Sequence, residues 1–366
     1  MSSLLDRSVL SPSSSITAVE LGTSGQGSAK PKKVDRNPAL DFTKGALVLI
    51  MVLYHWINYF IGPQWGYYKY LHFLTPSFIF ITGFMVSNVY LSKYAAADPR
   101  LSRRLFTRGL KLLAIFVVLN LARTVVVPVL GTGALVQHPL DPANIFAVFV
   151  SGNVPAGGGK VAAFPILVPI SYLLMLSGVL MLPYRFYKYT FQVVCVLLLL
   201  SVFLLGLTGA QSANLECVTI GMVGTLTGFV SIEAINNFVR HPYVLALAYL
   251  CYTIAITIWN VPFPLLIVGV FLSLMVIYLA GGSGSEFGTL RSEIILLGKY
   301  SLLGYISQIA ILQILSAGFR HINLGVAGLA MSFLAAFALT IVIVEVVDRA
   351  RAKTAITDKL YKAVFA

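Results

Sequence analysis

Apolar residues gather into long runs along most of the chain, and short polar segments separate these runs. A helix that crosses a bilayer needs about 20 mostly apolar residues, and each run comes close to that length. The pattern therefore predicts an all-α integral membrane protein, a bundle of about ten transmembrane helices. The ten runs cover residues 45–61, 71–91, 109–130, 162–182, 190–208, 213–232, 242–259, 262–280, 294–315 and 324–347.

Basic residues divide unevenly among the segments that join the runs. An even number of spans puts both termini on one side, and Lys and Arg indicate that this side is the cytoplasm. All but four of the 26 Lys and Arg residues then lie in cytoplasmic segments. This bias explains most of the net charge of +13, so no nucleic-acid partner is expected. The four exceptions are Lys69, Arg123, Lys160 and Arg320.

Polar stretches predict how the chain is divided. Residues 1–37 contain SPSSS and TSGQGS and are expected to be a disordered cytoplasmic tail, without a signal-peptide core. Residues 38–348 form the predicted transmembrane domain, and residues 349–366 a basic cytoplasmic tail. The longest external connection, 131–161, contains HPLDP and PAGGGK and is the expected lid or substrate-facing loop. A plasma or inner membrane is the default location.

Composition excludes several other classes of protein. With 58% hydrophobic and 11% charged residues, the chain differs from soluble domains, in which about 25% of residues are charged. Membrane lipid is thus its first partner, and a homo-oligomer stays open. A small-residue pair, Gly224 and Gly228, predicts close helix packing in the sixth run. The cysteines all lie in apolar runs, which argues against disulfides and a metal site; they are Cys195, Cys217 and Cys251.

His55 lies inside the first run, where an ionisable group is costly. Asn58 and Tyr59 follow it at i+3 and i+4, so an imidazole, an amide and a phenol share one helix face. This stripe can position a base beside hydrogen-bond donors. A satisfied core histidine is the other reading of the same spacing.

Arg123 lies within the third run, one turn after Asn120. Its guanidinium either faces the bundle interior, where it could stabilise an oxyanion or bind an anionic group, or reaches the outer surface. A structural pair with Glu216 is a further reading. Gln308 and Gln313 are expected to join neighbouring helices by hydrogen bonds. A basic cluster before the third run suits the phosphates of a nucleotide-like donor, although the orientation rule alone also predicts it; it comprises Arg103, Arg104 and Arg108.

Four segments, in order, resemble the transmembrane acyltransferase superfamily, which includes acyltransferase-3 proteins, heparan-alpha-glucosaminide N-acetyltransferase-like proteins and glucan succinyltransferases. The first, RNPALDFTKGALVLIMVLYH, is similar to that superfamily's arginine, L-D-x-x-R-G, apolar helix and histidine. The others are TPSFIFITGFMVSNVYLSKY, RLSRRLFTRGLKLL and LLGKYSLLGYISQIAILQ. Two positions depart from the pattern, because Lys44 replaces an arginine and Gln308 a frequent histidine. The first pattern is read on Arg36, Leu40, Asp41, Lys44, Gly45 and His55.

The resemblance implies an enzyme that moves an acyl group, most simply acetyl or succinyl, from cytoplasmic acyl-CoA to an acceptor outside. The acceptor would be a hydroxyl or amine, commonly on a carbohydrate such as a glycan. His55 would then act as the base or as the acyl carrier. Asn58 or Arg123 are our geometric candidates for the oxyanion contact. By the same resemblance, the donor end of the protein would be ordered by Arg36, Asp41 and Lys44, with Arg103, Arg104 and Arg108 on donor phosphates.

A multi-pass transporter of a small molecule is the main alternative. Transporters often contain two related halves, whereas the segment from Asp41 to His55 has no counterpart after residue 200. Few ionisable groups are present to relay protons. The acyltransferase interpretation is therefore preferred.

Overall fold

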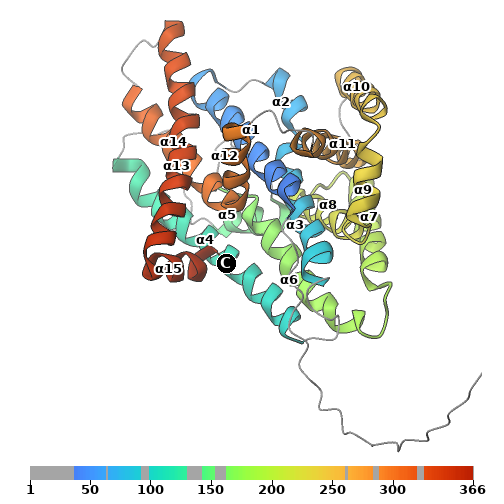
Figure 1. Cartoon of the computed structure of the whole chain (residues 1–366). Coiled ribbons are helices and arrows are strands. Elements are labelled where there is room, and N and C mark those ends of the chain that lie inside the picture. Colours follow the sequence, from blue (N-terminus) through green and yellow to red (C-terminus); the bar gives the residue numbers. More distant parts are fainter. Residues whose placement is uncertain are drawn as a thin grey trace, which may run out of the picture. The chain divides into compact units, whose positions relative to one another are not determined.

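The computed structural model describes residues 37–62, 65–91, 99–129, 142–152, 162–259, 263–282, 288–319 and 325–365. Within these ranges every regular element is a helix, which confirms the all-α prediction (Figure 1). The predicted tail 1–37 and Arg36 lie outside the described residues, except for Asn37. The elements are α1 (Pro38–Phe60), α2 (Trp65–Leu71), α3 (Leu74–Met85), η1 (Val86–Leu91), α4 (Pro99–Val129), α5 (Pro142–Phe146), η2 (Ala147–Ser151), α6 (Leu167–Tyr184), α7 (Thr190–Leu207), α8 (Ala213–Thr227), α9 (Ile232–Val239), α10 (Pro242–Ile258), α11 (Phe263–Gly282), α12 (Gly288–Lys299), α13 (Ser301–Phe319), α14 (Gly325–Lys353) and α15 (Ala355–Phe365).

Length and composition make this chain a multi-pass integral membrane protein. Among the described residues, eight helices are long and apolar enough to cross a membrane, and the number rises to nine when a bent helix pair is counted as one span. All ten predicted apolar runs contain helix, but α10, at 17 residues, is too short to be counted among the full-length spans. The predicted bundle is thus present in outline, with fewer full-length spans than ten.

The prediction of one straight helix for the sixth span is wrong. The helix α8 ends at Thr227, and α9 leaves it at an angle of 99°. The side chain of Ser231 caps the new helix by accepting a hydrogen bond from the backbone N–H of Ala234 at 3.2 Å. Apolar residues continue across this corner, so hydropathy alone hides it, whereas the serine cap marks the start of a new helix. The run 294–315 similarly divides at Tyr300 into α12 and α13.

The helix α1 starts sharply and occupies the centre of the bundle. The side chain of Asn37 accepts hydrogen bonds from the backbone N–H groups of Ala39 and Leu40, and Pro38 fills the first helical position. Both features are strong helix-start signals. The helix packs against α3, α11, α12, α13 and α14. Trp56 donates a hydrogen bond from Nε1 to Ser332 Oγ at 2.9 Å, which fixes the rotation of α1 relative to α14.

Glycines allow two helix pairs to approach until their backbones touch. Gly45 of α1 lies against the Ile294 carbonyl of α12, and Gly298 of α12 lies against the Asp41 carbonyl. At the crossing of α3 and α8, Gly224 faces the carbonyl of Phe80. Gly228 also faces the end of α3, so the predicted close packing of the Gly224 and Gly228 pair is confirmed. A side chain on any of these glycines would push one backbone away from another.

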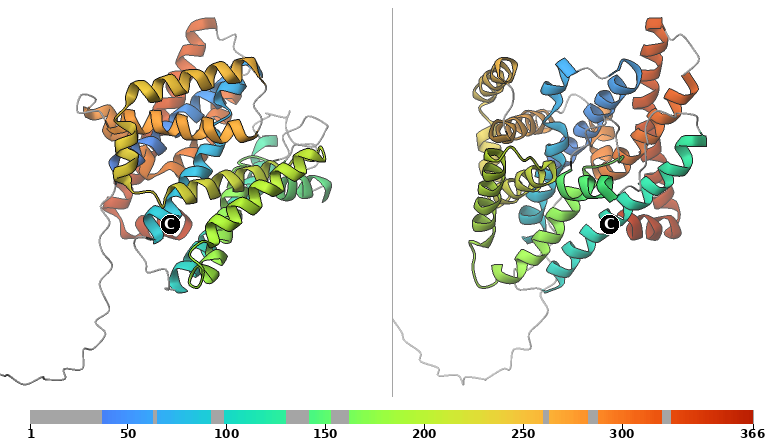
Figure 2. Two further views of the ribbon diagram at one scale, coloured as in Figure 1. Left: turned by 90° about the vertical axis from the view of Figure 1, so that its right-hand side faces the viewer. Right: turned by 180° about the vertical axis from the view of Figure 1, so that it is seen from behind.

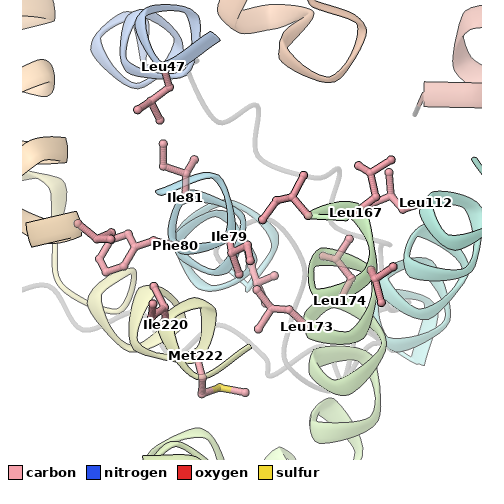
Figure 3. Close-up of a cluster of buried hydrophobic side chains, with 14 of the residues drawn as sticks. Leu47, Ile79, Phe80, Ile81, Leu112, Leu167, Leu173, Leu174, Ile220 and Met222 are labelled. Carbon is pink, nitrogen blue, oxygen red and sulfur yellow. The ribbon is translucent and has the colours of Figure 1, made fainter. Parts of the chain in front are cut away.

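The main apolar core joins α1, α3, α4, α6 and α8 (Figure 3). Fully buried side chains from α3, α6 and α8 meet there, among them Ile79, Leu173 and Ile220. At its side, α10 and α11 run antiparallel beside each other (Figure 2, left), and α11 also contributes Leu266, Val270 and Leu274 to the main core. The core holds the inner ends of α4 and α6 together and so fixes one wall of the cavity described next.

Candidate functional site

Cationic side chains from three helices line a cavity of about 260 Å³. Lys44 comes from α1, Arg108 and Lys111 from α4, and Lys299 from the end of α12. The described lining includes no Asp or Glu. Such a concentration of positive charge is suited to phosphate or carboxylate groups.

The rest of the cavity wall is apolar. It is formed by α3, α4, α6 and α13, and the lining on this side includes Phe78, Ile81, Leu112, Ile166, Leu167, Ile170, Leu174 and Tyr305. The cavity therefore has a cationic part and an apolar part. A ligand that fits it carries an anionic head on a less polar arm.

The predicted donor residues separate into two groups. Lys44 and Arg108 line the cavity, whereas Arg103 and Arg104 are exposed and do not belong to its lining. Lys111 was missed, although it stands at i+3 from Arg108 and so shares its helix face. Lys299 was also missed, because the sequence does not show that α12 ends beside α1.

Asp41 holds Lys44 in place. Its carboxylate lies 2.6 Å from the ammonium nitrogen of Lys44, and both side chains are largely buried. Buried charges of this kind are stable only when paired. Arg108 is held similarly, since it donates a hydrogen bond to the hydroxyl of Tyr90. These contacts position two of the four cations before any ligand enters.

His55 lies on α1, eleven residues beyond Lys44. Its ring is half-buried and meets Tyr54 edge to face at 5.0 Å between centroids. Tyr54 lies 5.9 Å from Tyr68 of α2, and Tyr68 lies 5.3 Å from His72. We call these four residues the histidine cluster. His72 joins this cluster only through Tyr68 and Tyr54, and the packing of α2 against α1 that brings them together has no local sequence pattern.

The side chain of Asn58 forms a hydrogen bond within its own helix, α1. Its Nδ2 donates to the backbone carbonyl of Tyr54 at 2.9 Å, and its side chain also interacts with the Tyr54 hydroxyl. In this arrangement Asn58 orients Tyr54 within the histidine cluster. An oxyanion contact through Asn58 would require the amide to leave the Tyr54 carbonyl.

Arg123 faces the protein interior. It interacts electrostatically with Tyr59 of α1, whose hydroxyl also interacts with Gln313. The Arg123 Nε is buried without a hydrogen-bond partner among the described residues, and within that same part of the chain Arg123 forms no ion pair with Glu216. The interior reading is therefore favoured over the pair with Glu216.

Gln308 lies on α13, one turn beyond Tyr305 of the cavity lining. Gly304, one turn earlier on α13, contacts Val48 of α1, and Leu312, one turn later, shares a buried cluster with Val52. The Gln308 side chain is fully buried, and neither its nitrogen nor its oxygen has a hydrogen-bond partner among the described residues. The predicted hydrogen bond to a neighbouring helix is thus not formed there. An unpaired buried amide costs about 1–3 kcal/mol, so it points to a bound water or ligand.

A strained turn packs against the wall of the cavity. Phe164, just before α6, is buried and has a positive φ of 58°, which is unfavourable for a bulky side chain. Its ring meets Tyr305, which lines the cavity, at 5.7 Å. Asn120 pins the turn by accepting from the Ala163 N–H at 2.8 Å and donating to the Ala163 carbonyl at 3.0 Å. Non-helical backbone at membrane depth is tolerated where protein buries it.

The C-terminal helix α15 turns across the end of α14 and reaches the cavity (Figure 1). Arg351 of α14 holds it, because this guanidinium donates to Asp358 Oδ1 at 2.7 and 3.1 Å and to the Tyr300 hydroxyl at 2.9 Å. Tyr300 in turn donates to Asp348 at 2.6 Å. Burial and the nearby Asp348 raise the pKa of Tyr300 to about 12. Lys362 and Arg351 lower the pKa of Asp358, so the carboxylate stays charged at neutral pH.

No group of three or more His, Cys, Asp or Glu side chains converges within the described residues. No protein-family model, curated protein or solved structure matches the chain. The fold and the two sites thus define a multi-pass helical membrane protein with a cavity partly lined by cationic side chains.

Proposed function

We propose that this protein is a membrane-bound acyltransferase that takes an acyl group from cytoplasmic acyl-CoA and transfers it to a hydroxyl or amine on the other side. The observation that carries the proposal is the cavity, which combines four cations with an apolar wall, and one of these cations, Lys44, lies on the helix that also bears His55. Phosphates of the donor would bind the cations, and its arm would extend along the apolar wall. The four segments similar to the transmembrane acyltransferases support the same reading.

The distance between the cavity and His55 favours a donor with a long arm. Eleven residues of α1 separate Lys44 from His55, which is roughly 16 Å at 1.5 Å per residue. A thioester at the end of a flexible arm can cross this distance while the phosphates stay on the cations. Tyr305 lines the cavity and its ring contacts that of Phe164, so the arm would pass beside this aromatic pair if it left the cavity on the side of α13.

The chemistry at His55 then follows one of two routes. In the first, the imidazole accepts the proton of the acceptor while the acceptor oxygen or nitrogen attacks the thioester carbonyl. The carbon–sulfur bond breaks, and the leaving thiolate takes the proton from His55. In the second, His55 itself attacks the carbonyl, and the leaving thiolate takes the proton that the acylated ring gives up. The acceptor then attacks the acyl carbon, the bond between this carbon and the ring nitrogen breaks, and the imidazole takes the proton of the acceptor. Asp41 acts at a distance in both routes, by holding Lys44.

Charge reversal in the cavity tests the donor site. We expect Lys299→Glu and Lys111→Glu each to weaken acyl-CoA binding at least about tenfold, since each removes a charge-assisted contact and adds repulsion. Arg103→Glu is the matched control, because Arg103 is exposed and lies outside the cavity lining. Titration calorimetry of the purified protein would measure all three. A loss confined to Arg103→Glu would place the donor elsewhere and contradict the proposal.

The variant Gln308→Leu tests whether Gln308 contacts the donor or only contributes to packing. Leucine removes a buried amide that has no partner among the described residues, so the variant should be as stable as wild type or more stable. If Gln308 contacts the donor arm, acyl transfer should nevertheless fall about tenfold. Thermal unfolding and transfer rates on the same preparation give both quantities. Full transfer activity in a stabilised variant would show that the amide does not contact the donor.

A small-molecule transporter is the second candidate, and one observation favours it. The sharp bend between α8 and α9 resembles the broken helices that transporters use at their binding sites. Such a protein would carry its substrate across vesicles without consuming a thioester. Release of free thiol from acyl-CoA, dependent on an acceptor, supports the enzyme; uptake into proteoliposomes without thiol release supports the transporter.

A further inference from the structure

The inner face of α15 forms one side of the cavity. Tyr361, Val364 and Phe365 all belong to its lining, next to cations from α1, α4 and α12. Two other apolar residues of the helix, Ile356 and Leu360, are strongly exposed and do not belong to the lining. One side of α15 therefore lines the cavity.

Aromatic stacking makes this side rigid. The rings of Tyr361 and Phe365 stack with centroids 5.0 Å apart and an interplanar angle of 27°. The Arg351 guanidinium lies 4.1 Å from the Tyr361 ring centroid and also contacts the ring of Tyr300. Because the same guanidinium binds Asp358, one residue of α14 fixes both the position and the tilt of the aromatic pair.

A planar aromatic surface beside a group of cations is the arrangement that recognises nucleotides. Nucleobases stack on aromatic rings because each base has a flat π face, and phosphates bind Lys and Arg. A donor without a base, such as an acyl phosphate or a phospholipid, would make no use of the aromatic pair. The pairing of Phe365 with the cavity cations therefore favours a nucleotide-bearing donor over these.

We propose that α15 forms the nucleobase subsite of the cavity, in which a purine-type base stacks on Phe365 while its phosphates bind Arg108, Lys111 and Lys299. This inference rests on the proposed function and specifies its donor as a nucleotide thioester. The cavity, at about 260 Å³, is slightly smaller than the ~300–1,000 Å³ of typical ligand sites. The helix α15 is joined to α14 through Thr354 alone, and the contacts of Arg351 hold its aromatic pair at the cavity.

The test compares a ligand with a base and a ligand without one. Titration calorimetry of the full-length protein in detergent would use adenosine 3′,5′-bisphosphate and inorganic pyrophosphate as probes. Phe365→Ala should weaken adenosine bisphosphate about tenfold, within the roughly 5- to 150-fold range of base stacking, and change pyrophosphate less than about twofold. Phe365→Trp should retain the nucleotide affinity. Ile356→Ala, at an exposed residue outside the lining, is the matched control and should change neither ligand.

Three results would overturn the subsite: pyrophosphate binding as tightly as the nucleotide, equal losses for both probes in Phe365→Ala, or no nucleotide binding to wild type. The outcome is independent of catalysis. If the nucleotide binds with the expected dependence on Phe365 but no acyl-CoA is turned over, the subsite stands and the proposed acyltransferase function fails. If acyl-CoA is turned over while Phe365→Ala leaves nucleotide affinity unchanged, the function stands and the subsite fails.

Discussion

His55→Ala is expected to lower the rate of acyl transfer by about 100- to 10,000-fold, the range that a general acid–base residue supplies. The physical reason is that His55 supplies the imidazole on the α1 side of the histidine cluster. Its α1 neighbour in the cluster, Tyr54, is a far weaker base at neutral pH. Donor affinity should stay within about twofold, because His55 does not line the cavity. Thiol release and acceptor acylation, measured on the purified protein, give the rate.

His72→Ala is the matched control for this prediction. His72 belongs to the same cluster but reaches His55 only through Tyr68 and Tyr54, so it should lose no more than about tenfold. Equal melting temperatures of the two variants would show that neither loss comes from unfolding. Full transfer activity in His55→Ala would show that His55 is neither the base nor the acyl carrier, whether or not the cavity binds the donor.

The sequence predicts the apolar helices well and the breaks between them poorly. Hydropathy marks each run because lipid demands about 20 apolar residues, and all ten runs contain helix. The corner after Thr227 and the break at Tyr300 both lie inside apolar stretches, so the hydropathy continues across them. Hydropathy marks where apolar residues run and not where a helix ends. The serine cap at Ser231 was the available signal for the first break.

The candidate site was predictable only where its residues share one helix. Lys44 and His55 both lie on α1, and the pairing of Asp41 with Lys44 follows from their i, i+3 spacing. Lys299 and Phe365 reach the cavity from elements far along the chain. Their approach depends on the contact between α1 and α12 and on the clamp of Arg351, neither of which has a local pattern. Long-range packing therefore decides which of the many cations face a ligand.

Gly298→Ala is expected to lower the free energy of unfolding by about 2–3 kcal/mol, the upper range for overpacking. A Cβ atom on Gly298 would overlap the Asp41 carbonyl oxygen and lie 3.1 Å from the backbone nitrogen of Gly45. Both are backbone atoms, so no side-chain rotation relieves the clash, and α1 and α12 must separate. The separation would move Lys299 and the pair of Asp41 with Lys44, so donor affinity should also fall.

Gly318→Ala, near the end of α13, provides a control of the opposite sign. An added Cβ there meets nothing within 4 Å among the described residues, and alanine is favoured over glycine in a helix by up to about 1 kcal/mol. Thermal unfolding in one detergent should thus lower the melting temperature of Gly298→Ala and leave that of Gly318→Ala unchanged or raised. Equal stability of the two variants would mean that α1 and α12 do not touch through their backbones. The position of Lys299 beside Lys44 would then lose its physical basis, and with it the four-cation cavity.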